Sequence, residues 1–407
     1  MVAIAILLIV ATGCQTADQP VASLELSQLV VNTPEGVSIP APGPVITAVA
    51  PATAAPVEPT AVPATATSAP ESTPFYAGPL SPACGQLLPV VPTNPEPETT
   101  SLTIDAATRA QLEAAAPAVA WPALERLLDA PGTVGLVAYQ LGQQDNGVFL
   151  NVNTPMPLAS VVKLITLVAY SEAVATGELD PLEAVPLEDV DSFYLPNFDL
   201  GAHRRAVNEL RADGRVSGGD NPTVLLEDIA LMMIRHSSNA ASDYLHNRLG
   251  QTRIEQTAID LGLTTQTAPC PFIGQFLLMG NHTRGQTADM TALQGYVAGD
   301  PAQYGTDVTL LTDAYSNSEL FREAEVDWRA DTRRPTIETQ RYFTENLNAQ
   351  ASAGDYADLM ARLSQNGLSS PDSSFQARKI LGGLTSLRLT RNCSAMWDIK
   401  TAVYPVC

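Results

Sequence analysis

Residues 21–97 are dominated by Pro, Ala, Thr and Val, as in the run APATAAPVEPTAVPATATSAPESTP. This stretch lacks the regular apolar spacing with which helices and strands contribute to a core. A Pro-rich chain of this kind is extended and semi-rigid. The main folded part of the protein must therefore follow it, and we predict a tether at 15–101 and a folded domain at 102–407.

The chain begins with MVAIAILLIVATGC, a short apolar run that ends in small residues and a cysteine. The run is too short for a transmembrane helix and predicts a signal peptide at 1–14. Its ATGC ending resembles a bacterial lipobox, in which Cys14 is lipidated and becomes the mature N-terminus. It departs from that pattern because no Lys or Arg precedes the run and Ala11 replaces a larger aliphatic residue. We expect an extracytoplasmic, secreted protein that is attached to the bacterial cell membrane through a lipid at Cys14.

The formal net charge of −21 argues against nucleic acid as a partner, because the sequence has no basic patch to neutralise phosphates. The histidines, at positions 203, 236, 246 and 282, show no metal-ligand spacing and have no carboxylate cluster beside them. The sequence contains no GxSxG elbow, phosphate-binding loop or dinucleotide fingerprint. We therefore expect neither a metal nor a cofactor.

The composition changes at about residue 102, where SLTIDAATRAQLEAAAPAVAWPALERLLDA has helical spacing. TVGLVAYQL and GVFLNVN then predict two strands, with QQDNG as the turn between them. LLEDIALMMIRHSSNAASDYLHNRLG predicts two helices separated at HSSN, where Ser238 or Asn239 can cap the second. TADMTALQGYVAG and GDYADLMARLSQNG are also helical in pattern. Strands followed by many helices predict an α+β domain, with a helical layer packed on an antiparallel sheet.

The chain has only three lysines, and one of them, Lys163, lies within the apolar run PLASVVKLITLVAY. Lysine is rarely buried, because the removal of its charge from water is costly. Ser160 lies near the first turn of the helix predicted here, and residues three apart share a helix face. A serine hydroxyl beside a desolvated amine is one way to form a nucleophile. The alternative is a Lys163 that extends from an amphipathic helix to the surface.

The order of Ser160, Lys163 and then Ser237-Ser238-Asn239 resembles the S-x-x-K and S-x-N motifs of penicillin-binding proteins and class A β-lactamases. The segments MPLASVVKL, GELDPLEAVPL and MMIRHSSNAASDYL are similar to family segments and occur in the family order. The resemblance covers about residues 130–300 and extends less clearly to 381. S-x-N alone has low specificity, because Ser364-Gln365-Asn366 matches it too. A helix cap is the alternative for the serines of the first S-x-N, and a cap is compatible with catalysis.

The resemblance implies that Ser160 is the acylated nucleophile and that Lys163 is its proton partner. Ser237 would relay a proton to the leaving nitrogen, and Asn239 would hydrogen-bond Lys163 and the substrate amide. The backbone N–H of Ser160 would supply half of an oxyanion hole, and a strand with a K-[ST]-G motif would supply the rest. The implied partner is a small-molecule or peptide acyl donor, either a β-lactam or a peptidoglycan-like peptide, and the implied state is a monomer.

Class A β-lactamases also have a Glu in an E-x-x-L-N loop, which activates the water that deacylates the enzyme. ENLN in this sequence places Glu345 one residue short of that spacing, which makes Glu345 a possible deacylation base. Without such a base the acyl-enzyme should be long-lived, as in penicillin-binding proteins. The segment 262–351 is also much longer than the family's loop there. Two activities therefore remain open, β-lactamase-like and D,D-peptidase-like, with an inactive cell-surface binding domain of the same fold as a third reading.

The chain ends KILGGLTSLRLTRNCSAMWDIKTAVYPVC, without a K-[ST]-G motif. The codons of this tail can also be read in another frame, which starts at the third base of each codon. From Met396-Trp397-Asp398 onward, this frame permits the sequence VGYKNGSLPG. That sequence contains K-N-G, which resembles the missing motif. In the same frame Gly382-Gly383-Leu384 permits Trp-Pro. Our interpretation is that the tail after about residue 382 is out of frame.

The cysteines fit this interpretation, since Cys393 and Cys407 are then accidental. With Cys14 lipidated, Cys84 and Cys270 remain as an even pair in a secreted protein. Such a pair predicts one disulfide that joins the end of the tether to the domain. It requires the two Cα atoms to lie within roughly 7 Å of each other.

Overall fold

The computed structural model describes residues 9–10, 84–90, 105–118, 120–280, 290–331 and 335–382. The predicted lipidation site Cys14, most of the predicted tether and the tail after Gly382 lie outside these residues. Among the described residues, no helix is both long enough and apolar enough to cross a membrane.

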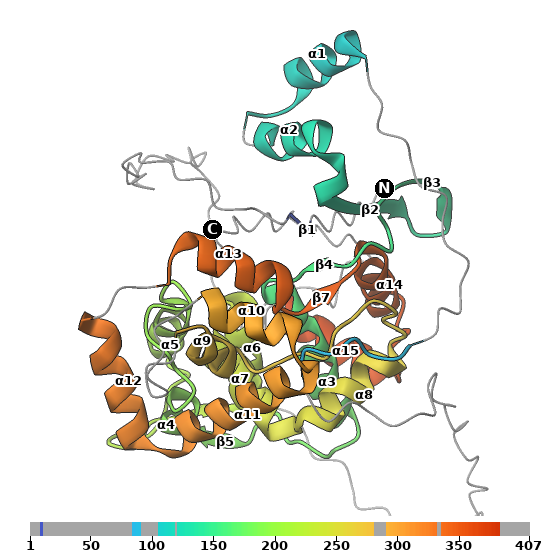
Figure 1. Cartoon of the computed structure of the whole chain (residues 1–407). Coiled ribbons are helices and arrows are strands. Elements are labelled where there is room, and N and C mark those ends of the chain that lie inside the picture. Colours follow the sequence, from blue (N-terminus) through green and yellow to red (C-terminus); the bar gives the residue numbers. More distant parts are fainter. Residues whose placement is uncertain are drawn as a thin grey trace, which may run out of the picture. The chain divides into compact units, whose positions relative to one another are not determined.

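Helices form most of the described chain (Figure 1). The α-helices before the S-x-N motif are α1 (Ala106–Ala115), α2 (Trp121–Asp129), α3 (Lys163–Ala175), α4 (Leu187–Asp191), α5 (Ala202–Ala212) and α6 (Leu226–Arg235). Those after it are α7 (Asn239–Leu249), α8 (Gln251–Asp260), α9 (Phe272–Gly280), α10 (Met290–Ala298), α11 (Pro301–Asn317), α12 (Glu319–Asp331), α13 (Ile337–Asn346), α14 (Ala353–Ser364) and α15 (Pro371–Leu381). Short 3-10 turns, η1 (Pro131–Thr133) and η2 (Ser160–Val162), precede β2 and α3.

The strands form small antiparallel sheets. They are β1 (Ile9–Val10), β2 (Val134–Gln140), β3 (Gln143–Leu150), β4 (Met156–Pro157), β5 (Ala184–Pro186), β6 (Thr223–Leu225) and β7 (Gln350–Ala351). The pairings are β1–β2–β3, β4–β7 and β5–β6, and β1 lies within the predicted signal peptide. Mixed helices and antiparallel strands confirm the predicted α+β class.

The β2–β3 hairpin turns at Leu141 and Gly142, earlier than the predicted QQDNG turn, which was wrong. Gly142 has φ 79°, a left-handed conformation that glycine adopts without steric cost. The glycine of QQDNG, Gly147, instead lies inside β3, where a Cβ would be 2.5 Å from Cε2 of Phe149 and 2.9 Å from Cβ of Tyr139. Gly147 is therefore needed for close packing between the strands rather than for a turn.

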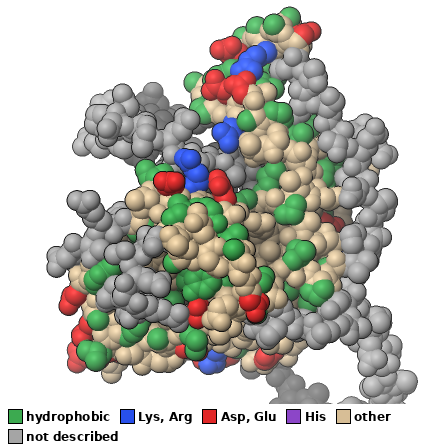
Figure 2. Space-filling model, in the orientation of Figure 1, with side chains coloured by type: hydrophobic (Ala, Val, Ile, Leu, Met, Phe, Trp, Pro, Cys, Tyr) green, Lys and Arg blue, Asp and Glu red, His purple; other side chains and the backbone are tan. Residues whose placement is uncertain are grey.

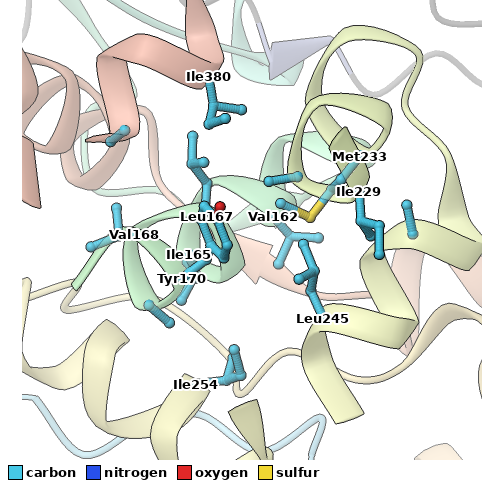
Figure 3. Packing of buried hydrophobic residues seen from close by; sticks show 14 of the residues in the cluster. Val162, Ile165, Leu167, Val168, Tyr170, Ile229, Met233, Leu245, Ile254 and Ile380 are labelled. Carbon is cyan, nitrogen blue, oxygen red and sulfur yellow. The ribbon is translucent and has the colours of Figure 1, made fainter. Parts of the chain in front are cut away.

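The core surrounds α3, against which α6, α7, α8 and α15 pack. Because it is enclosed by these four helices, α3 has buried, mostly apolar side chains around its circumference. Figure 3 shows α3 side chains among those of its neighbours: Ile229 and Met233 of α6, Leu245 of α7, Ile254 of α8 and Ile380 of α15. The α3 residues Ile165, Leu167 and Val168 are fully buried. Each such side chain contributes about 1.5–3 kcal/mol of transfer free energy relative to an exposed one. A helix held from four sides is a rigid support for the residues at its N-terminus.

Residues 84–90, here called the strap, are part of the predicted tether but pack against the domain. Cys84 and Leu88 are each only 1% exposed. The backbone of the strap pairs with residues 266–268, through Gly85 N to Ala268 O (2.9 Å), Ala268 N to Gln86 O (2.7 Å) and Leu88 N to Gln266 O (2.9 Å). A disulfide joins Cys84 to Cys270 with a Cα–Cα distance of 5.0 Å.

The surface carries charges of both signs. On the face shown in Figure 2, described acidic and basic side chains are interspersed among hydrophobic and other polar ones. No broad basic area is visible among the residues drawn in colour.

Candidate active site

Ser160 and Lys163 lie at the N-terminal end of α3, which the preceding backbone holds in place. β4 pairs with β7, and Leu158 continues this pairing because its N–H donates to Ala349 O at 2.7 Å. Asn348 Nδ2 donates to Leu158 O at 2.8 Å. Ser160 then begins the η2 turn, and Lys163 is the first residue of α3. The two side chains are therefore three residues apart on one face, as the sequence predicts.

Ser237 and Ser238 lie between α6 and α7, at the predicted break, and Asn239 is the first residue of α7. Ser238 is the N-cap of α7, and its Oγ accepts from Ala241 N at 3.1 Å. Ser237 has φ 61°, an uncommon conformation for a residue other than glycine. Such a conformation persists where the surroundings hold it, and it is concentrated at functional sites.

Lys163 is the centre of the site. Its Nζ is 2.7 Å from Ser237 O, 2.8 Å from Asn239 Oδ1, 3.1 Å from Ser237 Oγ and 3.3 Å from Ser160 Oγ. Ser237 Oγ lies 2.6 Å from Ser160 Oγ. The structure thus brings all four predicted catalytic side chains together, although Ser160 and Ser237 are 77 residues apart in the sequence.

Lys163 is 2% exposed, so it does not extend to the surface. Burial lowers the pKa of Lys163 to about 7, and the negative charges of Asp243 and Asp199 oppose this shift. The Nζ atom also lies 4.7 Å from the centre of the Phe272 ring. Burial thus favours the neutral amine, the state in which Lys163 can accept a proton.

Asp243, on α7, is the buried carboxylate whose charge acts most strongly on Lys163. Its oxygens accept from Phe272 N (2.8 Å) and Ile273 N (2.7 Å), the first two residues of α9. Burial raises the pKa of Asp243 to about 7, and these two N–H donors oppose the shift. Both donors, and the N-terminal end of α9 to which they belong, favour the carboxylate form of Asp243. Asp243 thereby holds Phe272 against Lys163.

A neutral Lys163 fits its partners without an unmet hydrogen-bonding group. Its two N–H groups match the two closest acceptors, Ser237 O and Asn239 Oδ1, which cannot donate. The single nitrogen lone pair can then accept the hydroxyl hydrogen of Ser160, whose oxygen in turn accepts from Ser237 Oγ. The arrangement can remove a proton from Ser160 and pass it through Ser237 or Lys163, as general-base catalysis requires.

Glu345, the possible deacylation base, lies in α13 with an exposed side chain. Among the described residues, no hydrogen bond or ion pair joins a carboxylate to Ser160 or Lys163. Glu345 as a base therefore stays a prediction without a supporting contact.

Sequence reasoning missed Phe272 and Asp243, and also His203, whose Nδ1 lies 2.9 Å from Ser238 Oγ. Asp243 lies four residues after Asn239, so it is one turn further along the helix, and this spacing was an available signal. Nothing near Phe272 or His203 in the sequence indicates their contacts, because those contacts come from distant segments. The part of the chain that the structure describes contains no group of three or more His, Cys, Asp or Glu residues that could hold a metal ion.

Comparison with known proteins agrees with the geometry. No curated protein matches the chain. Residues 121–394, more than half of the chain, match the Beta-lactamase enzyme family (Beta-lactamase2). This segment includes all four residues of the site and the helices that hold them. The chain therefore belongs to the β-lactamase enzyme family.

Proposed function

We propose that the protein is a serine hydrolase that forms an acyl-enzyme at Ser160. Membership of the β-lactamase enzyme family indicates a serine-hydrolase-like function and acyl donors of the β-lactam or peptide type. The observation that carries the finer proposal is the 2%-exposed Lys163, with its Nζ 3.3 Å from Ser160 Oγ and 3.1 Å from Ser237 Oγ.

In the proposed acylation, neutral Lys163 accepts the Ser160 proton, directly or through Ser237, as Ser160 Oγ bonds to the acyl carbon. The negative charge on the carbonyl oxygen faces the backbone N–H of Ser160. Ser237 then delivers its proton to the leaving nitrogen and receives the proton held by Lys163, and the C–N bond breaks. Asn239 orients Lys163 and binds the amide of the acyl donor.

Two acyl donors fit this chemistry, a β-lactam and a D,D-peptide. The lack of a carboxylate in contact with Ser160 or Lys163 among the described residues favours slow deacylation, and so the penicillin-binding type of behaviour. We therefore favour a long-lived acyl-enzyme over rapid β-lactam turnover.

A fluorescent penicillin tests the proposal, since only an acylating protein becomes covalently labelled. We expect Ser160→Ala and Lys163→Ala to abolish labelling, Ser237→Ala to slow it and Asn239→Ala to weaken it less. Ser364→Ala, in the second S-x-N sequence, is the matched control and should label like its parent. Equal labelling of the parent and the Ser160→Ala protein would show that the nucleophile is wrongly assigned.

The labelling experiment needs two parent proteins. The first is the chain as written, with the sequence of residues 1–407. The second, the frame-restored protein, has the tail after about residue 382 replaced by the alternative-frame sequence that contains K-N-G. The second oxyanion donor is worth about 100- to 1000-fold in rate, so the chain as written should label poorly or not at all. Vigorous labelling of the chain as written would refute the frame interpretation, and the coding DNA around Gly382 would settle it directly.

A further inference from the structure

Behind the S-x-N segment lies a second polar cluster, made by Asp191, His203 and Ser238. His203 Nε2 is 2.7 Å from Asp191 Oδ1, and His203 Nδ1 is 2.9 Å from Ser238 Oγ. The side chain of His203 is 2% exposed and Ser238 is fully buried, whereas the Asp191 side chain is 51% exposed. The cluster thus connects the surface at the end of α4 to the first residue before α7.

The protons of this cluster can be assigned by counting donors and acceptors. The N–H of Ala241 only donates, so Ser238 Oγ must accept from it. Asp191 Oδ1, as a carboxylate oxygen, only accepts, so His203 Nε2 carries a proton and donates it to Asp191. In the neutral ring His203 Nδ1 then accepts the hydroxyl hydrogen of Ser238. This assignment satisfies every polar atom of the buried imidazole with the neutral tautomer.

The residue types are those of a Ser-His-Asp triad, but Ser238 cannot be a nucleophile. Its Oγ is buried and occupied as the cap of α7. What distinguishes Ser238 is its place in the chain, because its two neighbours hold Lys163. Ser237 provides its carbonyl and its hydroxyl, and Asn239 provides its amide oxygen. A displacement of Ser238 would therefore move three of the four hydrogen-bond partners of the Lys163 amine.

His203 itself is well anchored for such a role. Its backbone N–H donates to Asp199 Oδ2 at 2.7 Å, and its ring lies 4.8 Å from the Tyr194 ring. The strained backbone of Ser237, with φ 61°, needs restraint from its surroundings. The hydrogen bond from Ser238 to His203 is a side-chain restraint directly beside that strained residue.

We propose that the Asp191–His203 pair is a positioning device for residues 237–239, and that it thereby sets the geometry of Lys163 for acylation of Ser160. The catalytic part of this statement rests on the proposed function, whereas the positioning part does not. Asp191 fixes the tautomer of His203, His203 fixes Ser238, and Ser238 fixes its two neighbours.

The positioning part is tested by NMR of the full-length ¹⁵N-labelled protein, without any substrate. We expect His203 Nε2 to carry a proton that is hydrogen-bonded to Asp191, with its signal identified by its loss in His203→Asn. Asp191→Ala should shift or broaden the amide signals of Ser237 and Asn239, and this variant should fold because Asp191 is half exposed. Asp189→Ala is the matched control, with the same charge change on the same helix, and should leave both signals unchanged. Unchanged signals in Asp191→Ala as well would overturn the proposal, whether or not the protein acylates.

The catalytic part is tested with the penicillin label in the frame-restored protein. Asp191→Ala should lower the acylation rate constant at saturating penicillin about tenfold, the size expected for one lost hydrogen bond. The penicillin concentration that gives half the maximal rate should not change, because no substrate contact is lost. Asp191→Asn keeps an acceptor for Nε2–H and should recover most of the rate. The proposal is contradicted if Asp191→Ala changes only the half-saturating penicillin concentration and not the rate constant. It is also contradicted if Asp191→Asn does not recover the rate constant. If the frame-restored parent never labels while the NMR result holds, the proposed function is refuted and the positioning role stays supported.

Discussion

Lys163 is a side chain whose surroundings determine what it can do. Burial disfavours its charged form, while Asp243 and Asp199 favour it, and the balance places its pKa at about 7. An ordinary lysine is almost entirely protonated at that pH and cannot accept a proton. The same burial that is costly for folding thus makes the amine a base at physiological pH.

The first prediction concerns the pH dependence of acylation. Because the proposed base is the neutral Lys163 amine, the acylation rate of the frame-restored protein should rise with pH and reach half of its plateau near pH 7. Stopped-flow measurement of labelling between pH 5 and 9 checks this. A rate that is constant across this range would show that Lys163 does not act as the base.

The second prediction concerns stability. The folded-state pKa of Lys163 lies below its unfolded value, so between about pH 7 and 10.5 the unfolded chain binds more protons. The contribution of Lys163 to stability therefore rises with pH across this window and is least favourable below pH 7. The thermal midpoint of Lys163→Met, relative to that of the parent, should be highest below pH 7. This advantage of Lys163→Met should shrink as the pH rises toward 10.5. A difference independent of pH would contradict the shift.

At the level of elements, the sequence predicted what local patterns can encode. Periodicity and capping residues predicted the break at HSSN, a cap at Ser238 or Asn239 and a helix within residues 354–367. The structure has the break, the cap at Ser238 and a helix at 353–364. The hairpin turn was wrong because packing between strands, rather than turn geometry, requires Gly147. The N-terminus of α9 over Lys163 was not predictable, because no local pattern indicates that residues 243 and 272 meet. The four candidate catalytic residues were found from motifs, but the side chains that orient them are contributed by distant segments.

The third prediction compares two helix caps. Asp243 caps α9 from within the core with two hydrogen bonds, whereas Asp300 caps α11 at the surface by accepting from Ala302 N at 2.9 Å. Asp243→Ala leaves two buried N–H groups unpaired and should cost about 2–4 kcal/mol of unfolding free energy. Asp300→Ala should cost about 1 kcal/mol. Urea denaturation checks both, and equal costs would show that Asp243 does not fix α9.

At the level of the whole molecule, two covalent attachments bear on residues before 105. The disulfide at Cys84 is in the structure, and the lipid at Cys14 stays a proposal. Between them lies the Pro-rich stretch, which would keep a folded domain away from a membrane surface.

The fourth prediction concerns the disulfide. Its two cysteines are separated by 186 residues, so the bond strongly restricts the unfolded chain. Cys84→Ser should lower the unfolding free energy by about 2–5 kcal/mol. The comparison of thermal midpoints with and without reductant checks this, since reductant should lower the midpoint of the parent and leave the variant unchanged. A parent insensitive to reductant, with the bond shown to be reduced, would contradict it.

The fifth prediction concerns the anchor. If Cys14 carries a lipid, the mature protein should partition into detergent, and Cys14→Ala should move it to the aqueous phase. Phase separation in a mild detergent, with mass spectrometry of the N-terminus, checks both. A wild-type protein that is entirely aqueous and retains residues 1–13 would exclude the anchor.

The pairing of the strap with residues 266–270 also has a consequence for biosynthesis. Cys84 is synthesised 186 residues before its partner, which takes roughly 10–40 s at about 5–20 residues per second. Throughout that interval the nascent chain has a Cys84 thiol without its native partner. In an oxidising compartment this thiol can form a disulfide with another cysteine. Only after Cys270 emerges can the strap close over residues 266–268. A thiol probe added to chains of increasing length should therefore label Cys84 until the ribosome has passed the start of α9.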